Sequence, residues 1–160
     1  MERTPDMTIT VLLNRIQILE AAVNDERRRA EVDALTGIGN LLMLERRSSA
    51  RGGWFVMADL NGFKQAQDSH PDGHVFGDTV LKEFASFLVR SCRDRQDRLA
   101  IRKGGDEFVI WCQERHGARA IKERIRKWKS IYGDVTAAAG LGSDIYSADA
   151  AMYIDKGRKQ

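Results

Sequence analysis

A Gly-Gly-Asp-Glu segment between two apolar runs most constrains the fold of this 160-residue chain. Residues 99–101 and 109–111 are apolar, and residues 104–107 lie between them. Short apolar runs joined by two glycines predict a β-hairpin, because glycine adopts the positive φ angles that tight turns require. Two adjacent carboxylates at an exposed turn repel each other, and a bound cation would relieve that repulsion. An ordinary polar turn without any ligand explains the same four residues, so other parts of the chain must decide.

A second acid follows a run that reads as a buried strand. Residues 54–58 are wholly apolar, as in a central strand covered on both faces, and the run ends at Asp59. An acid there is costly unless it is paired or bound to a metal. Neighbouring strands lie about 5 Å apart, so Asp59 and Asp106 would be able to share one cation such as Mg²⁺. Lys64, five residues after Asp59, is placed to meet phosphate oxygens.

The remaining hydrophobic pattern predicts a hairpin inside a helix-flanked sheet, which is an α+β or mixed α/β sandwich. Residues 65–74 are polar and contain a proline and a glycine, so they are predicted to form a loop or a broken turn. We divide the chain into an N-terminal helix at residues 1–32 and a domain at residues 33–160. The expected elements are helices over residues 8–32, 41–47, 78–92, 118–128 and 148–156, strands over 54–58 and 135–141, and a hairpin over 98–113.

The N-terminal helix carries apolar residues at alternating spacings of three and four, which are Ile9, Leu12, Ile16, Leu19 and Val23. This spacing predicts the seam of a short coiled coil, which would join two copies of the chain and raise the local concentration of facing sites. Two heptads are fewer than the three or four that define a coiled coil, and an amphipathic helix packed on its own domain shows the same pattern. A third reading is that the helix docks on a partner protein.

The composition narrows the expected setting and partners. A net charge of +3 suits phosphate-bearing small molecules and does not by itself indicate nucleic acid, so we expect no nucleic-acid partner. No apolar run approaches the roughly 18 residues of a membrane span, and residues 1–6 lack the apolar core of a signal peptide, so we expect no membrane association. Cys92 and Cys112 fit reduced thiols, which favours a cytoplasmic location.

Five motifs occur in order along residues 33–158, and in combination they resemble the GGDEF-domain family of diguanylate cyclases. The motifs are Asp33-x-Leu35-Thr36-Gly37 with Asn40, Asp59-Leu60-Asn61-Gly62-Phe63-Lys64, Gly73-His74-x-x-Gly77-Asp78, Arg102-x-Gly104-Gly105-Asp106-Glu107-Phe108, and Ala148-Asp149-x-Ala151-Met152-Tyr153. The resemblance implies an α+β fold with a palm-like, mostly antiparallel central sheet flanked by helices. It also implies condensation of two GTP molecules into cyclic di-GMP with release of pyrophosphate. Each domain would hold one GTP, so two domains must face each other in a homodimer.

The resemblance also implies a metal and catalytic machinery. Asp59, Asp106 and the backbone carbonyl of Leu60 would bind Mg²⁺ (or Mn²⁺), and Glu107 would add negative charge at that metal site. Asp106 is the position that would accept the proton of the 3′-hydroxyl. Lys64 would stabilise charge in the transition state of phosphoryl transfer.

Substrate contacts are carried over from the family to Phe63, Gln67, Asp78, Gly104, Gly105, Lys156 and Arg158. Asp78 would accept hydrogen bonds from the guanine edge, the two glycines would admit the nucleotide, and Lys156 would hold terminal phosphates. Three departures fall in this set. Gln67 stands where the family has asparagine, the loop before Gly73 is two residues longer, and Arg158 follows Lys156 by two positions instead of four.

The family's product-inhibition motif, Arg-x-x-Asp, is degenerate here. Arg95 keeps the arginine position, and Arg98 replaces the acid. We therefore expect weak or absent product inhibition at this site, although a nearby aspartate would be able to substitute in part.

Two other functions stay open on these motifs. The altered base pocket around Gln67 fits a module that binds GTP or cyclic di-GMP without turnover and acts as a regulator. It also fits a cyclase with a different dinucleotide product, although Asp78 favours guanine.

Overall fold

The computed structural model describes residues 7–48, 52–92 and 98–157. Its centre is a four-stranded sheet with the order β2-β3-β1-β4, and every neighbouring pair is antiparallel. The strands are β1 (Trp54–Asn61), β2 (Arg98–Gly104), β3 (Glu107–Cys112) and β4 (Thr136–Gly142). The expected α+β class with an antiparallel sheet is therefore confirmed.

Six helices accompany the sheet in the described residues. They are α1 (Met7–Ala30), α2 (Leu41–Ser48), α3 (Phe63–Ser69), α4 (Gly73–Ser91), α5 (Arg115–Arg126) and α6 (Ile145–Gly157). Helices α4 and α5 cover one face of the sheet, and α2 and α6 cover the other. None of these helices is long and apolar enough to cross a lipid bilayer.

Alternating side chains of β1 contribute to a hydrophobic core on each face of the sheet. Val56 and Ala58 belong to the core under α4 and α5, whereas Met57 belongs to the core under α2 and α6, and all three are fully buried. This confirms a central strand covered on both faces. Because side chains alternate along a strand, Asp59 lies on the same side as Met57, toward α6.

Helix α6 lies against β4 at backbone contact. A Cβ added at Gly140 would come within 2.1 Å of the Met152 nitrogen, and one at Gly142 within 2.3 Å of the Ala148 nitrogen. Both glycines lie on the face that α6 covers. The absence of side chains there lets the helix approach the sheet more closely than any other residue would allow.

The loop or broken turn predicted over residues 65–74 is confirmed only at residues 70–72 and is wrong on either side of them. Helix α3 occupies Phe63–Ser69, and α4 begins at Gly73, five residues earlier than expected. The loop prediction rested on Pro71 and Gly73, which lie after α3, while residues 64–67 favour a helix. Burial adds to this, since Phe63 and Phe76 are 8% and 9% exposed. Strand β1 also continues past Asp59 to Asn61, where β4 still pairs with it.

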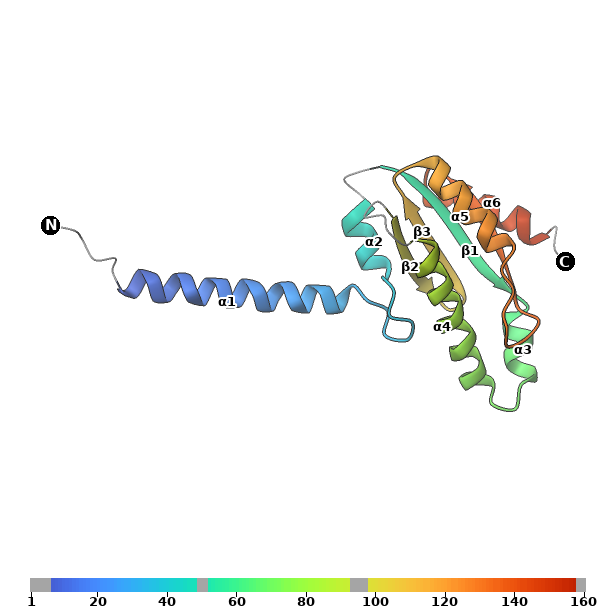
Figure 1. Ribbon diagram of the computed structural model, residues 1–160, viewed down its shortest axis with the longest axis horizontal. Coiled ribbons are helices and arrows are strands. Elements are labelled where there is room, and N and C mark those ends of the chain that lie inside the picture. Colours follow the sequence, from blue (N-terminus) through green and yellow to red (C-terminus); the bar gives the residue numbers. More distant parts are fainter. Residues whose placement is uncertain (1–6, 49–51, 93–97, 158–160) are drawn as a thin grey trace.

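Helix α1 extends away from the domain (Figure 1). Its seam residues are about half exposed, from 47% at Val23 to 61% at Leu19. Packing of this helix on its own domain, one of the three readings of its pattern, is therefore wrong. The coiled-coil and partner-docking readings stay predictions.

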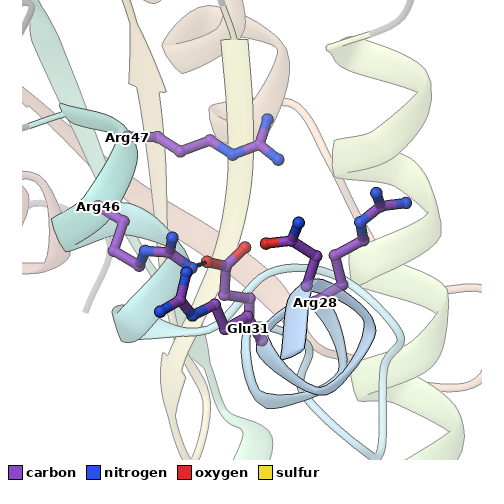
Figure 2. A pocket seen from close by; sticks show the side chains of 6 residues that line it. Arg28, Glu31, Arg46 and Arg47 are labelled. Atoms are coloured by element: carbon purple, nitrogen blue, oxygen red, sulfur yellow. Dashed lines mark hydrogen bonds and ion pairs between the residues drawn. The ribbon is translucent and has the colours of Figure 1, made fainter. Parts of the chain in front are cut away.

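The end of α1 is joined to α2 by one asparagine and one ion pair. The Asn40 side chain donates to the carbonyl of Ala30 at 2.7 Å and accepts from the backbone nitrogen of Leu42 at 3.0 Å, so it caps α2 while holding α1. Glu31, which is buried, forms an ion pair with Arg46 (Figure 2).

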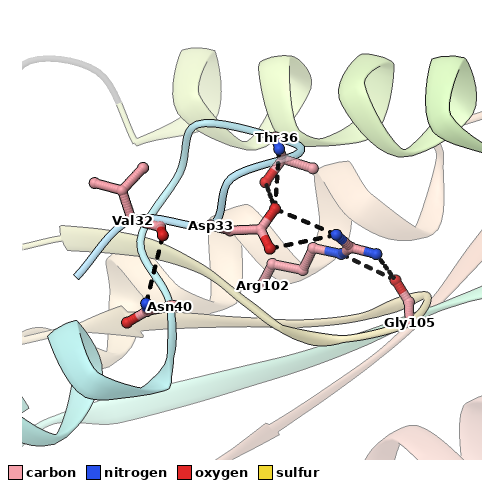
Figure 3. A network of polar contacts seen from close by, with 6 residues as sticks. All are labelled: Val32, Asp33, Thr36, Asn40, Arg102 and Gly105. Atoms are coloured by element: carbon pink, nitrogen blue, oxygen red, sulfur yellow. Dashed lines mark hydrogen bonds and ion pairs between the residues drawn. The ribbon is translucent and has the colours of Figure 1, made fainter. Parts of the chain in front are cut away.

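The turn after α1 is tied to the hairpin between β2 and β3 (Figure 3). The Asp33 carboxylate accepts from the backbone nitrogen of Thr36 at 2.9 Å and from the Arg102 guanidinium at 3.3 Å. The same guanidinium donates to the Gly105 carbonyl at 2.8 and 3.0 Å. Burial opposes ionisation of Asp33, but the bonds from Thr36 and Arg102 outweigh it and lower the pKa of this carboxyl.

We expect Gly140→Ala to destabilise the domain by about 1–3 kcal/mol, because the new methyl group would meet the backbone of α6. The measurement is the free energy of unfolding in urea. Gly157→Ala is the matched control, since a Cβ there meets nothing within 4 Å. Equal stability of the two variants would contradict the close packing of α6 on β4.

We also expect Asp33→Asn to lower the free energy of unfolding by about 1–2 kcal/mol at pH 7, because the ion pair with Arg102 is lost. The pKa of Asp33 is lowered by folding, so its contribution is present above about pH 4 and is lost as the pH falls through the folded-state value. The variant should therefore lose less stability than the parent between pH 5 and pH 2. Asp68→Asn, an exposed acid on α3, should keep the parental profile.

Candidate functional site

Acidic side chains gather where β1 and β3 run side by side. Asp59 on β1 is the register partner of Glu107 on β3, and Asp106 directly precedes Glu107 at the tip of the hairpin. The Asp59 side chain is only 11% exposed. Burial raises its pKa, and the negative charges of Asp106 and Glu107 raise it further. The structure therefore brings together the acids that the sequence predicted to converge.

The hairpin tip has the open, glycine-dependent turn that the sequence predicted. Gly104 and Gly105 have φ angles of +154° and +52°, and a Cβ at either position would meet nothing within 4 Å. These glycines are therefore required by the backbone and leave free space above the turn. A bulge between Arg102 and Gly104 precedes the turn, and Arg102 holds the Gly105 carbonyl.

Lys156 reaches the acids from the last turn of α6. Its Nζ donates to Asp59 Oδ1 at 2.6 Å. Burial alone would lower the pKa of Lys156, but the contact with Asp59 outweighs it and raises that pKa. Asp59 and Lys156 thus form a charged pair, which the sequence did not predict, because Lys156 was assigned to terminal phosphates.

Asp155 fixes the part of α6 that carries Lys156. Its carboxylate accepts from the backbone nitrogen of Ala139 on β4 at 3.1 Å and lies 2.9 Å from Arg126 Nε on α5. Strand β4 is at the edge of the sheet, so this carboxylate satisfies a donor of an edge strand. Asp155 was not among the residues predicted from the sequence; the two glycines of β4, which let α6 come within reach, are the signal that pointed to it.

A second group of predicted residues meets around Gly77, where α3 and α4 pack. A Cβ at Gly77 would lie 2.8 Å from Gln67 Nε2 and 3.3 Å from Phe63 Cζ, and Asp78 is the next residue on α4. The Gln67 amide also lies 3.4 Å from His74 Nδ1. Asp78 is exposed beside this contact. The predicted base-binding residues are therefore close to one another.

Lys64 lies on α3, the helix that follows β1. It is exposed in the first turn of α3, just after Gly62 turns the chain out of β1 with a φ of +73°. Within the described ranges, no hydrogen bond or ion pair connects Lys64 to the acids. It is three residues past the end of β1, at the position in the chain from which the sequence predicted its role.

The degenerate inhibition motif is described only in part. Arg95 and Arg158 lie outside the described residues. Arg98 begins β2, and its guanidinium lies against α5, where a Cβ at Gly117 would come within 2.6 Å of Arg98 Nη2.

Both cysteines are free thiols, and burial raises the pKa of Cys92 to about 11.

The oxygen atoms at this site suit a hard cation that binds together with the phosphates of a substrate. Over residues 7–48, 52–92 and 98–157, no three or more acidic, histidine or cysteine side chains are grouped to hold a metal ion. Mg²⁺ in phosphate-transfer sites is usually held by one or two carboxylates, water and substrate phosphates instead of a complete protein cage. The carboxylates of Asp59 and Asp106 with the carbonyl of Leu60 fit that pattern.

Comparison with known proteins identifies relatives that are described as diguanylate cyclases. A family profile described as "Diguanylate cyclase, GGDEF domain" matches residues 30–160. The diguanylate cyclase DgcS of Shewanella oneidensis is 36% identical over 124 residues, covering 71% of this chain and 39% of DgcS. The diguanylate cyclase DgcP of Pseudomonas aeruginosa is 31% identical over 180 residues, covering 91% of this chain and 26% of DgcP. The chain thus spans less than half the length of either relative.

Solved structures share the fold. The coiled coil and GGDEF domain of DgcB from Caulobacter crescentus, in complex with c-di-GMP, has a TM-score of 0.69 and 22% identity, covering 96% of this chain and 94% of that one. SiaD from Pseudomonas aeruginosa, in complex with its activator SiaC, has a TM-score of 0.66 and 27% identity, covering 95% and 68%. Together with the matched profile and the acidic hairpin beside β1, these likenesses show that the chain belongs to the GGDEF-domain family.

Proposed function

We propose that this chain is a diguanylate cyclase that condenses two GTP molecules into cyclic di-GMP, with a divalent metal and as a homodimer. Each 3′-hydroxyl would attack the α-phosphate of the other GTP, forming a phosphodiester bond and releasing pyrophosphate. The observation that carries the proposal is the pairing of Asp59 with Glu107 beside Asp106, at an open glycine turn. Catalytically inactive relatives would have no reason to keep every one of these charged groups.

The acids have separate tasks in this proposal. Asp106 accepts the proton of the 3′-hydroxyl, while Asp59, Glu107 and the Leu60 carbonyl make the site negative. Bound Mg²⁺ or Mn²⁺ would supply charge neutralisation at the triphosphate and activation of the hydroxyl. The raised pKa of Asp59 supports this assignment, because a buried carboxylate beside two other acids is stabilised by a cation.

Cationic and base-binding groups surround the acids. Lys64 stabilises the transition-state charge from α3, and Lys156 exchanges its contact with Asp59 for a terminal phosphate. Gln67, which packs against Gly77, and Asp78, the next residue on α4, hold the guanine base. The glycine turn admits the phosphates, and Arg158 is assigned to them by the family resemblance alone.

A dimer is proposed through α1. Two domains must face each other for two GTP molecules to react, and the exposed seam of α1 offers the surface that would join them. The solved DgcB structure comprises a coiled coil together with a GGDEF domain, which supports this arrangement. SiaD was solved with an activator protein, so docking of a partner on the helix is the competing outcome.

We expect the purified chain to convert GTP to cyclic di-GMP in Mg²⁺, with at least a 100-fold loss of rate in Asp106→Ala and no product in EDTA. Chromatography of reactions with GTP, ATP or both identifies the product. Asp144→Asn, an exposed acid away from the hairpin, should retain the parental rate. GTP binding without product would instead indicate a regulatory module, and a mixed dinucleotide would indicate altered base selection at Gln67.

We expect the double variant Leu12→Asp, Ile16→Asp to elute as a monomer in size-exclusion chromatography and to lose cyclase activity at low protein concentration. Two charges in the seam would prevent two α1 helices from packing together. Ile18→Asp adds a charge to an off-seam position of the same helix, which is 68% exposed, and should stay dimeric. A parent chain that is monomeric at every concentration would refute the α1 dimer.

A further inference from the structure

A pocket of about 270 Å³ lies at the junction of α1 and α2. It is lined by Asn24, Arg27, Arg28, Glu31, Arg46 and Arg47, none of which belongs to the acidic site. Figure 2 shows Arg46 meeting Glu31, with Arg28 on α1 and Arg47 on α2 around that pair. Nothing in the proposed cyclase reaction uses these residues.

The charges that line this pocket are unbalanced. Four guanidinium groups meet one carboxylate, and that carboxylate, Glu31, is already paired with Arg46. In the described part of the chain, no hydrogen bond or ion pair engages Arg27, Arg28 or Arg47. A guanidinium stays charged at any physiological pH, so the pocket keeps an excess of positive charge that an anion would neutralise.

The lining residues also indicate the kind of anion. Guanidinium groups bind phosphate oxygens through paired hydrogen bonds, and several of them together favour a ligand with adjacent phosphates. Among the described residues, the side chains that line the pocket are all polar or charged, so the lining favours phosphate oxygens. A volume of about 270 Å³ is enough for a short chain of phosphates.

We propose that this pocket binds a polyphosphate group, either inorganic or as the tail of a nucleotide. Arg27 and Arg28 come from α1, whereas Arg46 and Arg47 come from α2. A bound polyphosphate therefore bridges the projecting helix and the domain. The Asn40 bond to Ala30 already holds the two walls of the pocket together, so little ordering is needed on binding.

The test is calorimetric titration of the whole chain with sodium tripolyphosphate, in EDTA and at constant ionic strength. We expect saturable binding with one site per chain, and at least 10-fold weaker affinity in the double variant Arg28→Gln, Arg47→Gln. The control is Arg15→Gln, Arg90→Gln, which removes the same charge from exposed positions on α1 and α4. Its affinity should stay within twofold of the parent. Circular dichroism checks that both variants are folded.

A parallel titration with ATP in EDTA separates the two sources of the phosphate group. Equal binding of ATP and tripolyphosphate, lost together in the pocket variant, supports a nucleotide tail; binding of tripolyphosphate alone supports the inorganic anion. Absence of saturable binding by either, or an equal loss in the pocket and control variants, would overturn the proposal. Because EDTA excludes turnover and the readout is binding, these results are independent of whether the chain is a cyclase.

Discussion

The close packing of α6 on β4 is the contact on which the arrangement of the acidic site depends. Gly140 and Gly142 leave no side chain between helix and strand, so α6 lies directly on the edge of the sheet. Asp155 then bonds to β4 and to Arg126 on α5, which fixes the last turn of α6. The next residue, Lys156, consequently reaches the carboxylate of Asp59.

This arrangement places the carboxylate of Asp59 where burial disfavours its ionised form. Asp59 ends a run of fully buried residues and is itself largely buried, and its pKa is raised by desolvation and by the neighbouring acids. Lys156 offsets part of that cost, which explains why the contact forms. A bound cation, or a metal ion that arrives with phosphate, would stabilise the ionised form of these carboxylates. The raised pKa of Asp59 therefore fits a role in binding.

The hairpin tip is held by contacts at the other edge of the sheet, where β2 lies. Arg102 joins the Asp33 turn to the Gly105 carbonyl, and that turn directly follows the end of α1. The projecting helix, the arginine-lined pocket and the glycine turn are therefore connected through one short stretch of chain at residues 31–40. A ligand or a partner that fixes α1 would act at the start of this connection.

Local pattern in the sequence was sufficient to predict the hairpin, the buried central strand and the convergence of Asp59 with Asp106. Strand alternation and the conformational freedom of glycine depend on nearest neighbours, and the sequence displays both directly. It was insufficient for α3, whose helix-favouring residues 64–67 were outweighed in the prediction by the breakers Pro71 and Gly73 that follow them, and which burial of Phe63 stabilises. It was also silent on the contacts of Lys156, Asp155 and Arg102, because each joins segments far apart in the chain. Only the packing of α6 on β4, and of the Asp33 turn on the hairpin, decided those contacts, since long-range distances are set by how whole elements pack.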